Sequence, residues 1–421
     1  MIKTNNLSNN IKVVYEALDH FKSTAIAVWV KTGSCCETNE ENGISHFIEH
    51  MLFKGTEKRT AKQIAVEMDS IGGQVNAFTS KECTCYYARV VDDKAEVAID
   101  VLSDLLLNST IDAVELDKER QVILEEISMT KDHPDDLAHD KISENYFRGS
   151  EYSKPIIGPS ENIKRYKRQD LIDYMDKHYY PENIVISVAG KFDEEQLNKM
   201  LEKYFGRFEN KSNKRYKQSC GAPFVPEKSF MTIEKDIEQT HIVLGFNGVT
   251  MTDDERYAYS IFCNLFGGSM SSRLFQSIRE DMGLVYSVYS YLSAYTDCGM
   301  FGIYAATGAK TAVTALEIMK KEIIQVKKEG ISDEEFNNSK TQLMGNYKLA
   351  LESVTARMQS IGKNLLLLGK VESQEDVIKK LEKVTKSDVD KIVNYIFDFD
   401  KMSAVFVGKI EDEGKLKEIC D

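Results

Sequence analysis

The second half of this 421-residue chain repeats short segments of the first half in the same order. Three pairs of segments carry the repeat: Thr24–Val28 with Thr240–Leu244 at an offset of 216, Met51–Phe53 with Asn264–Phe266 at 213, and Ala189–Lys191 with Val407–Lys409 at 218. One such pair would mean little, but three pairs in one order at nearly one offset indicate two copies of an ancestral fold. We therefore predict two homologous domains with a pseudo-repeat of about 217 residues, a size that suits a globular domain.

Composition indicates where one copy ends and the next begins. Residues 209–218 are mostly polar, and Pro223 and Pro226 follow, which is typical of an interdomain linker. The predicted division is an N-terminal domain at 1–210, a linker at 211–226 and a C-terminal domain at 227–421. Strand-like runs alternate irregularly with amphipathic helices and include hairpin signatures, rather than strict strand–helix–strand units. The predicted fold class is α+β, with each domain a mostly antiparallel sheet covered by helices.

Two histidines and a glutamate stand in the order H-x-x-E-H within residues 43–53. At helical spacing, the apolar residues of this segment share one face that is suited to burial, whereas His46, Glu49 and His50 lie on the opposite face. Zinc sites in peptidases use two neutral imidazoles on adjacent turns and a carboxylate close enough to act on a water at the metal. Ordinary packing of histidine is the alternative, but only 7 of 421 residues are histidine and this pair lies off the apolar face. The segment therefore predicts a metal site.

A catalytic zinc ion needs a third protein ligand, and the helix predicted at 116–129 offers one. Glu119 and Glu126 are seven residues apart, so both face the same way on a helix, beside Ile123 and Ile127. Glu125 points elsewhere and is the weaker candidate. The alternative is a solvated acidic stripe, which would be the usual reading of an arbitrary helix.

The second copy lacks these groups. At the offset of 213, Tyr259, Phe262 and Cys263 stand where the first copy has the H-x-x-E-H side chains. The C-terminal domain is therefore predicted to keep the scaffold without metal ligands.

The H-x-x-E-H segment, followed 76 residues after His50 by Glu126, resembles the inverzincin metallopeptidases. This family includes pitrilysin, the insulin-degrading enzyme and the mitochondrial processing peptidase, and the resemblance covers essentially the whole chain. It implies a zinc metalloendopeptidase with one Zn²⁺ per chain, held by His46, His50 and Glu126. It also implies that Glu49 is the general base acting on a zinc-bound water and that Glu119 is a carboxylate assisting the site.

Further segments resemble parts of the family that bind substrate. Residues 74–79, with Asn76 and Ala77 at the centre, resemble the edge strand that pairs with an extended peptide backbone. Arg279 and Tyr286 match a family segment that reaches the active site, where they would bind substrate and stabilise the oxyanion. Without the resemblance, these two residues would be read as ordinary surface side chains.

Asp136 and Asp140 stand 10 and 14 positions after Glu126, where processing peptidases have two acidic residues that receive an arginine near the cleavage point. The resemblance thus implies a preference for a basic residue there. The formal net charge of −13 fits basic peptides and argues against nucleic acid as a partner.

The chain has about half the length of the four-domain family members and resembles the two-domain, bacterial processing-peptidase-like type, in which two chains close around a peptide as a clamshell. Because one chain carries both the zinc motif and Arg279 with Tyr286, we expect a homodimer; a heterodimer with a related chain stays open. The first residues do not show the apolar core that a signal peptide requires, no run of 18 apolar residues occurs, and the eight cysteines follow no zinc-ribbon spacing. We expect a cytoplasmic protein without a membrane partner, acting on short unfolded peptides or presequence-like segments.

Two other functions compete with the peptidase. Some family members are non-catalytic subunits, but such chains typically lose part of the H-x-x-E-H motif, which is complete here. A metal-free binding protein would require Glu126 and the matches in the second half to be accidents as well. The peptidase is the favoured function.

Overall fold

The computed structural model describes residues 1–209 and 224–421 of the chain. Most of the predicted linker, 211–226, therefore lies outside the described residues, as does Cys220. Contacts between residues divide the chain into two compact units, which we describe one at a time. Unit 1 comprises Met1–Ile127, Lys154–Cys220 and Leu349–Ser373. Unit 2 comprises Ser128–Ser153, Gly221–Lys348 and Gln374–Asp421. Both units are described only where the structure describes the chain. The predicted domain limits stay a prediction, because units defined by contacts need not coincide with the copies of a repeat.

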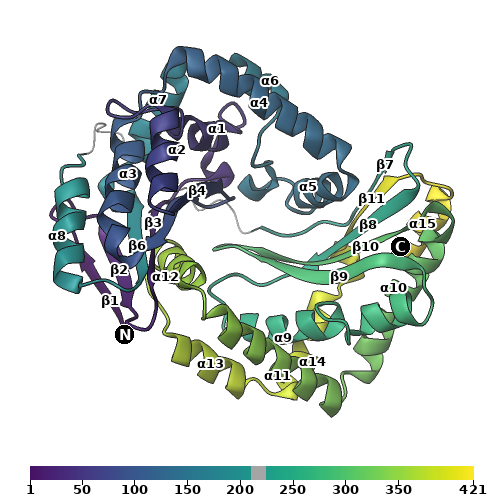
Figure 1. Cartoon of the computed structure of the whole chain (residues 1–421). Coiled ribbons are helices and arrows are strands. Elements are labelled where there is room, and N and C mark those ends of the chain that lie inside the picture. The colour runs from purple at the N-terminus through teal and green to yellow at the C-terminus, as the bar shows by residue number, and fades with distance from the viewer. Residues whose placement is uncertain (210–223) are drawn as a thin grey trace. The chain divides into compact units, whose positions relative to one another are not determined.

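Unit 1 is built on a six-stranded sheet in the order β1-β2-β6-β3-β5-β4 (Figure 1). Its strands are β1 (Ile2–Asn6), β2 (Lys12–Ala17), β3 (Ser23–Val30), β4 (Gln74–Thr79), β5 (Thr84–Val91) and β6 (Ile184–Gly190). The β2–β6 pair is parallel and every other neighbouring pair is antiparallel. The helices that fall in this unit are α1 (Ile44–Leu52), α2 (Ala61–Ser70), α3 (Ala95–Asn108), most of α4 (Ala113–Asp132), α6 (Ser160–Arg165), α7 (Arg168–His178), α8 (Glu194–Phe205) and α12 (Val354–Leu368).

Unit 2 is built on a five-stranded sheet in the order β7-β11-β8-β10-β9. Its strands are β7 (Ser229–Glu234), β8 (Gln239–Asn247), β9 (Val285–Ala294), β10 (Gly299–Gly308) and β11 (Ser403–Gly408). Its helices are α5 (Pro134–Tyr146), α9 (Arg256–Phe266), α10 (Ala312–Glu329), most of α11 (Asp333–Ala350), α13 (Gln374–Lys383), α14 (Lys386–Ile396) and α15 (Glu413–Cys420). Here β7 and β11 are the parallel pair. Each sheet is thus mixed but mostly antiparallel and covered by helices, so the predicted α+β class is confirmed.

The two sheets repeat each other in topology and in detail. Apart from the extra strand β1, the strands occupy the same places in chain order and run in the same senses. The hydroxyl of Thr24 donates to the carbonyl oxygen of Lys191 at 2.7 Å, and Thr240 donates to Lys409 at the same distance. The residue before each accepting lysine is a glycine with positive φ: Gly190 at 130° in the first sheet and Gly408 at 128° in the second. The repeat read from three short segments therefore corresponds to one fold used twice.

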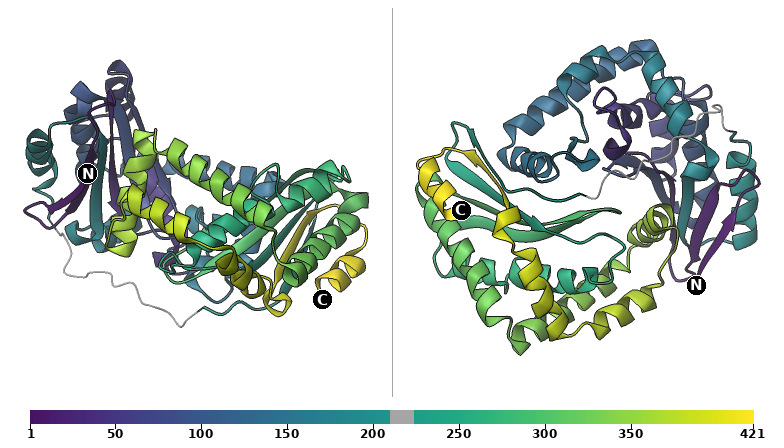
Figure 2. Two further views of the ribbon diagram at one scale, coloured as in Figure 1. Left: turned by 90° about the horizontal axis from the view of Figure 1, so that it is seen from below. Right: turned by 180° about the vertical axis from the view of Figure 1, so that it is seen from behind.

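Each sheet is covered on one face by a helix from the other half of the chain. In unit 1, α12 packs against β2, β3 and β6, and it is the yellow-green helix beside the sheet in Figures 1 and 2. In unit 2, α5 packs against β8 and β11. Because α4 and α5 in the first half correspond in order to α11 and α12 in the second, the exchange is reciprocal. We call this arrangement the helix exchange.

Small side chains allow α12 to lie close to its sheet. Ala25, Ala27 and Trp29 alternate along β3 with residues of the main unit 1 core, so they face the side that α12 covers. The indole N–H of Trp29 donates to the Ser187 hydroxyl at 2.8 Å. A Cβ at Gly362 of α12 would overlap both of these groups. This close packing explains why β3 and β6 are buried along nearly their whole length.

Of the helices in the described part of the chain, none combines the length and the hydrophobicity that a membrane crossing requires.

Candidate metal centre

Helix α1 is anchored at its N-terminus by the buried carboxylate of Glu37, which is 1% exposed. This carboxylate accepts hydrogen bonds from the backbone N–H groups of Gly43 at 2.8 Å and Ser45 at 2.9 Å, and from the Asn42 side chain at 2.9 Å. Burial raises the pKa of Glu37, and these three donors oppose the rise. Gly43 has a left-handed φ of 97°, where glycine is favoured. The helix that carries the H-x-x-E-H motif therefore begins at a defined place.

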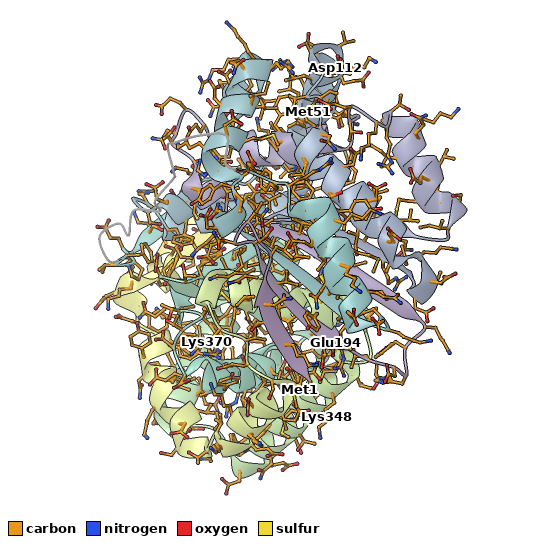
Figure 3. All side chains as sticks on the ribbon, turned by 90° about the vertical axis from the view of Figure 1, so that its left-hand side faces the viewer. Met1, Met51, Asp112, Glu194, Lys348 and Lys370 are labelled. Atoms are coloured by element: carbon orange, nitrogen blue, oxygen red, sulfur yellow. The ribbon has the colours of Figure 1, made fainter. Side chains whose placement is uncertain are left out.

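The two faces of α1 lie as the sequence predicts. Its apolar residues are buried in the unit 1 core: Ile44, Phe47, Ile48, Met51 (labelled in Figure 3) and Leu52. His46, Glu49 and His50 are only partly buried. The motif side chains are thus free of the hydrophobic core and available to a ligand.

Glu126 of α4 lies opposite the two histidines. Its Oε1 is 3.8 Å from Nε2 of His46, and its Oε2 is 3.6 Å from Nε2 of His50. The ligand atoms of the three residues lie within 4.8 Å of one another, and no other three His, Cys, Asp or Glu residues in the described ranges do so. Two ligands of one tetrahedral zinc ion, each bound at about 2.0–2.1 Å, are about 3.4 Å apart. The spacing and the two-nitrogen, one-oxygen donor set fit Zn²⁺.

Glu119 sets the orientation of His50. Its Oε1 lies 2.9 Å from Nδ1 of His50, and its Oε2 lies 2.6 Å from Nζ of Lys54. Burial of Glu119 tends to raise its pKa, but the hydrogen bonds from His50 and Lys54 outweigh burial, so the pKa is lowered. An ionised Glu119 accepts the Nδ1 proton of His50 and leaves the Nε2 lone pair for a metal. The alternative of a solvated acidic stripe does not hold for Glu119, which is 6% exposed.

The protonation state of His46 also favours metal binding, because its imidazole carries no added proton near neutral pH. Burial, together with the neighbouring His50, lowers the pKa of His46 to about 3. The imidazole is therefore neutral at pH 7, which is the form that binds a metal.

Glu49 lies between the two histidines in sequence and has one hydrogen-bonding neighbour. The hydroxyl of Thr79, at the end of β4, donates to Oε2 of Glu49 at 2.6 Å. Burial raises the pKa of Glu49, and the hydrogen bonds from Thr79 oppose the rise. A carboxylate with a raised pKa is a better proton acceptor, which suits a general base.

Strand β4 lies beside this group and forms an edge of the unit 1 sheet. Asn76 and Ala77 stand at its centre, paired with Tyr87 and Tyr86 of β5. The side-chain oxygen of Asn76 accepts the N–H of Ala77 at 2.8 Å. The predicted substrate strand is therefore an edge strand of the unit that carries the metal group, as backbone pairing requires.

The other four predicted site residues belong to unit 2. Asp136 and Asp140 are exposed on α5, one turn apart. The guanidinium of Arg279 lies 5.5 Å from the ring centre of Tyr286, which is 80% exposed at the start of β9. Within unit 2, Asp136, Asp140 and Tyr286 are exposed, whereas Arg279 is partly buried.

Helix α9 is the counterpart of α1 in unit 2. Its Tyr259 and Phe262 are fully buried, and Cys263 is partly buried. These positions pack into the hydrophobic core of unit 2 and carry no imidazole or carboxylate.

Three residues that support the site were not predicted from the sequence: Glu37, Lys54 and Thr79. Lys54 lies in the turn directly after α1, four residues after His50, and its side chain reaches the same carboxylate as His50. Glu37 and Thr79 belong to separate segments that only the fold brings to α1, and no local pattern marks them.

Comparison with known proteins identifies the family. Residues 12–160 match the family model described as insulinase (peptidase family M16), and residues 165–343 match the peptidase M16 inactive domain. A protein of Bacillus subtilis named uncharacterized zinc protease YmxG is 44% identical over 400 residues, covering 95% of this chain and 97% of its own. The chain belongs to peptidase family M16. The resemblance seen in the motifs is thereby confirmed.

Other similar proteins cover the chain to the same extent. A protein of Rickettsia felis named an uncharacterized zinc protease is 39% identical over 400 residues, covering 95% of this chain and 96% of its own. The crystal structure of a protease from Helicobacter pylori superposes with a TM-score of 0.91 at 20% identity, covering 97% of this chain and 99% of that one. A structure from Pseudomonas fluorescens, named peptidase M16 inactive domain, has a TM-score of 0.89, also at 20% identity, and covers 97% and 98%. At this identity the two structures show the two-domain M16 fold and nothing finer.

Proposed function

We propose that this chain is a zinc-dependent endopeptidase that hydrolyses short unfolded peptides or presequence-like segments. The observation that carries the proposal is the convergence of His46, His50 and Glu126 on the helix pair that also presents Glu49. Membership of peptidase family M16 and the zinc-protease names of its relatives support it.

In the proposed reaction, the residues of unit 1 handle the proton. A zinc ion held by the two histidines and Glu126 would supply Lewis acidity that polarises the scissile carbonyl. Glu49 takes a proton from the attacking water and delivers it to the leaving amine. Glu119 keeps His50 in the tautomer that offers Nε2 to the metal.

Substrate binding is proposed for both copies of the fold. An extended peptide would pair with the edge strand β4 at Asn76 and Ala77, through main-chain hydrogen bonds that are largely independent of sequence. Arg279 and Tyr286 would hold the peptide and stabilise the developing oxyanion. We propose that two copies of the chain form a clamshell chamber that excludes folded proteins. The alternative is a heterodimer with a related chain. We also propose that the protein acts in the cytoplasm.

The test of this function compares wild type with Glu49→Gln. We expect wild type to cleave an unstructured basic peptide and a chelator to stop cleavage. Glu49→Gln should keep its zinc, because Glu49 is not a ligand, yet lose at least about 100-fold in kcat, because a general base contributes about 10²–10⁴-fold. Peptide cleavage by mass spectrometry and metal content by plasma emission measure these outcomes. Full activity in Glu49→Gln, or cleavage that survives complete metal removal, would refute the proposal.

A basic side chain near the cleavage point should be preferred. Two exposed carboxylates on α5 are expected to favour an Arg-bearing peptide over its Glu-bearing version by about fivefold in kcat/KM, since exposed ion pairs are worth up to about 1 kcal/mol. Replacing both Asp136 and Asp140 by Asn should remove this preference, while Glu144→Gln on the same helix should keep it. Equal cleavage rates of the two peptides by wild type would contradict the assignment.

A further inference from the structure

We propose that Thr79 is a positioning residue for the general base. Through its hydroxyl, the strand β4 holds the Glu49 carboxylate in the orientation needed for proton abstraction. This inference rests on the proposed function. It adds a residue that links β4, the strand proposed to bind the substrate, to Glu49, the proposed general base.

The contact is short and it is exclusive. Oγ1 of Thr79 donates to Oε2 of Glu49 at 2.6 Å, as expected of a hydroxyl donating to an ionised carboxylate. Within residues 1–209 and 224–421, Thr79 is the only residue that hydrogen-bonds this carboxylate. One carboxylate oxygen is therefore held, and the other is left to accept a proton.

The hydroxyl is itself held in place by a tight hairpin. Thr79 is the last residue of β4 and pairs with Thr84, the first residue of β5. The turn between them is closed by Ser80, whose N–H donates to the Cys83 carbonyl at 2.8 Å and whose hydroxyl donates to the same oxygen at 2.9 Å. The N–H of Cys83 returns a bond to the Ser80 hydroxyl at 3.1 Å. Thr79 thus has little freedom to move away from Glu49.

The same strand is the proposed pairing edge for the peptide. A peptide that adds to β4 at Asn76 and Ala77 lies on the strand whose end fixes the base two residues later. One rigid strand, β4, would then position both the peptide backbone and the Glu49 carboxylate. Positioning by a rigid element keeps catalytic geometry within a fraction of an ångström. A purely structural hydroxyl would have no reason to matter more for kcat than for folding.

The experiment removes the hydroxyl and then restores it. Thr79→Val deletes the donor while keeping the β-branched shape, and Thr79→Ser keeps the donor. Thr84→Val is the matched control, because its hydroxyl lies in the same hairpin pair but donates to the Thr32 carbonyl at 2.9 Å. Peptide cleavage kinetics, zinc content and the thermal unfolding midpoint are measured for all three variants and for wild type.

We expect Thr79→Val to bind one zinc per chain, to keep KM within about twofold and to lose about 10-fold or more in kcat, a part of what a general base contributes. Thr79→Ser should recover most of kcat, and Thr84→Val should keep wild-type kcat.

Three outcomes would overturn the role of Thr79 while leaving the peptidase intact: wild-type kcat in Thr79→Val, no recovery in Thr79→Ser, or loss of zinc or of the folded state in Thr79→Val. A wild-type chain that cleaves no peptide would instead overturn the proposed function, and the role of Thr79 with it.

Discussion

Replacing Glu126 by Gln is expected to remove bound zinc and to abolish peptide cleavage. The two oxygens of Glu126 lie 3.8 and 3.6 Å from Nε2 of His46 and His50, so this carboxylate faces both histidines at once. A neutral amide oxygen is a poor substitute for an anionic ligand of Zn²⁺, and two histidines alone leave the ion one protein ligand short. Metal content after gel filtration and cleavage of an unstructured peptide measure the two effects.

The control for this substitution is the neighbouring residue. Glu125 is exposed on the same helix, and Glu125→Gln should keep full zinc content and activity. Glu119→Gln should be intermediate, with zinc bound about 10- to 100-fold more weakly, because it removes the partner of a ligand rather than a ligand. Stoichiometric zinc at wild-type affinity in Glu126→Gln would show that the metal is held elsewhere.

A fragment of residues 1–209 is expected not to fold on its own. It lacks α12, which covers the face of the unit 1 sheet at Trp29 and Ser187. Exposing an apolar sheet face of a few hundred Å² costs on the order of 5–10 kcal/mol, which is comparable with the whole stability of a domain. Trp29 is the only tryptophan of the chain and is 1% exposed, so its fluorescence reports this face. The isolated fragment should show red-shifted emission and no cooperative unfolding.

Adding residues 349–373 as a separate peptide provides the control. Binding of the peptide should shift the Trp29 emission back to shorter wavelength, whereas the same peptide with Gly362→Leu should not, because a side chain there would overlap the indole. Native emission from the fragment alone would show that α12 is dispensable for the fold.

The fold could be predicted from the sequence where the information is local or periodic. The apolar stripe of α1 and the strand pattern around Thr24 and Thr240 depend only on neighbouring residues, and the structure has both as expected. The repeat predicted one fold used twice, and the equivalent hydrogen bonds at Thr24 and Thr240 bear this out.

The helix exchange and the supports of the metal group could not be predicted. Nothing in the spacing of α12 says which sheet it covers, because that depends on packing across more than 150 residues of chain from Gly362 to Trp29 and Ser187. The same is true of Glu37 and Thr79, whose bonds to α1 and to Glu49 depend on where loops and a hairpin end in space.

The helix exchange also bears on the ancestry of the chain. A single-copy protein that gave its α5 counterpart to a second copy would exist as a domain-swapped dimer, with each subunit completing the other. Joining two such genes in one reading frame would place both copies, with their exchanged helices, in one chain, so that the two copies could no longer dissociate. In such a linked pair only one copy needs metal ligands, and the second copy has Tyr259, Phe262 and Cys263 at the corresponding positions. A chimera made from two relatives would then be expected to fold only if each sheet and the helix that covers it come from the same parent.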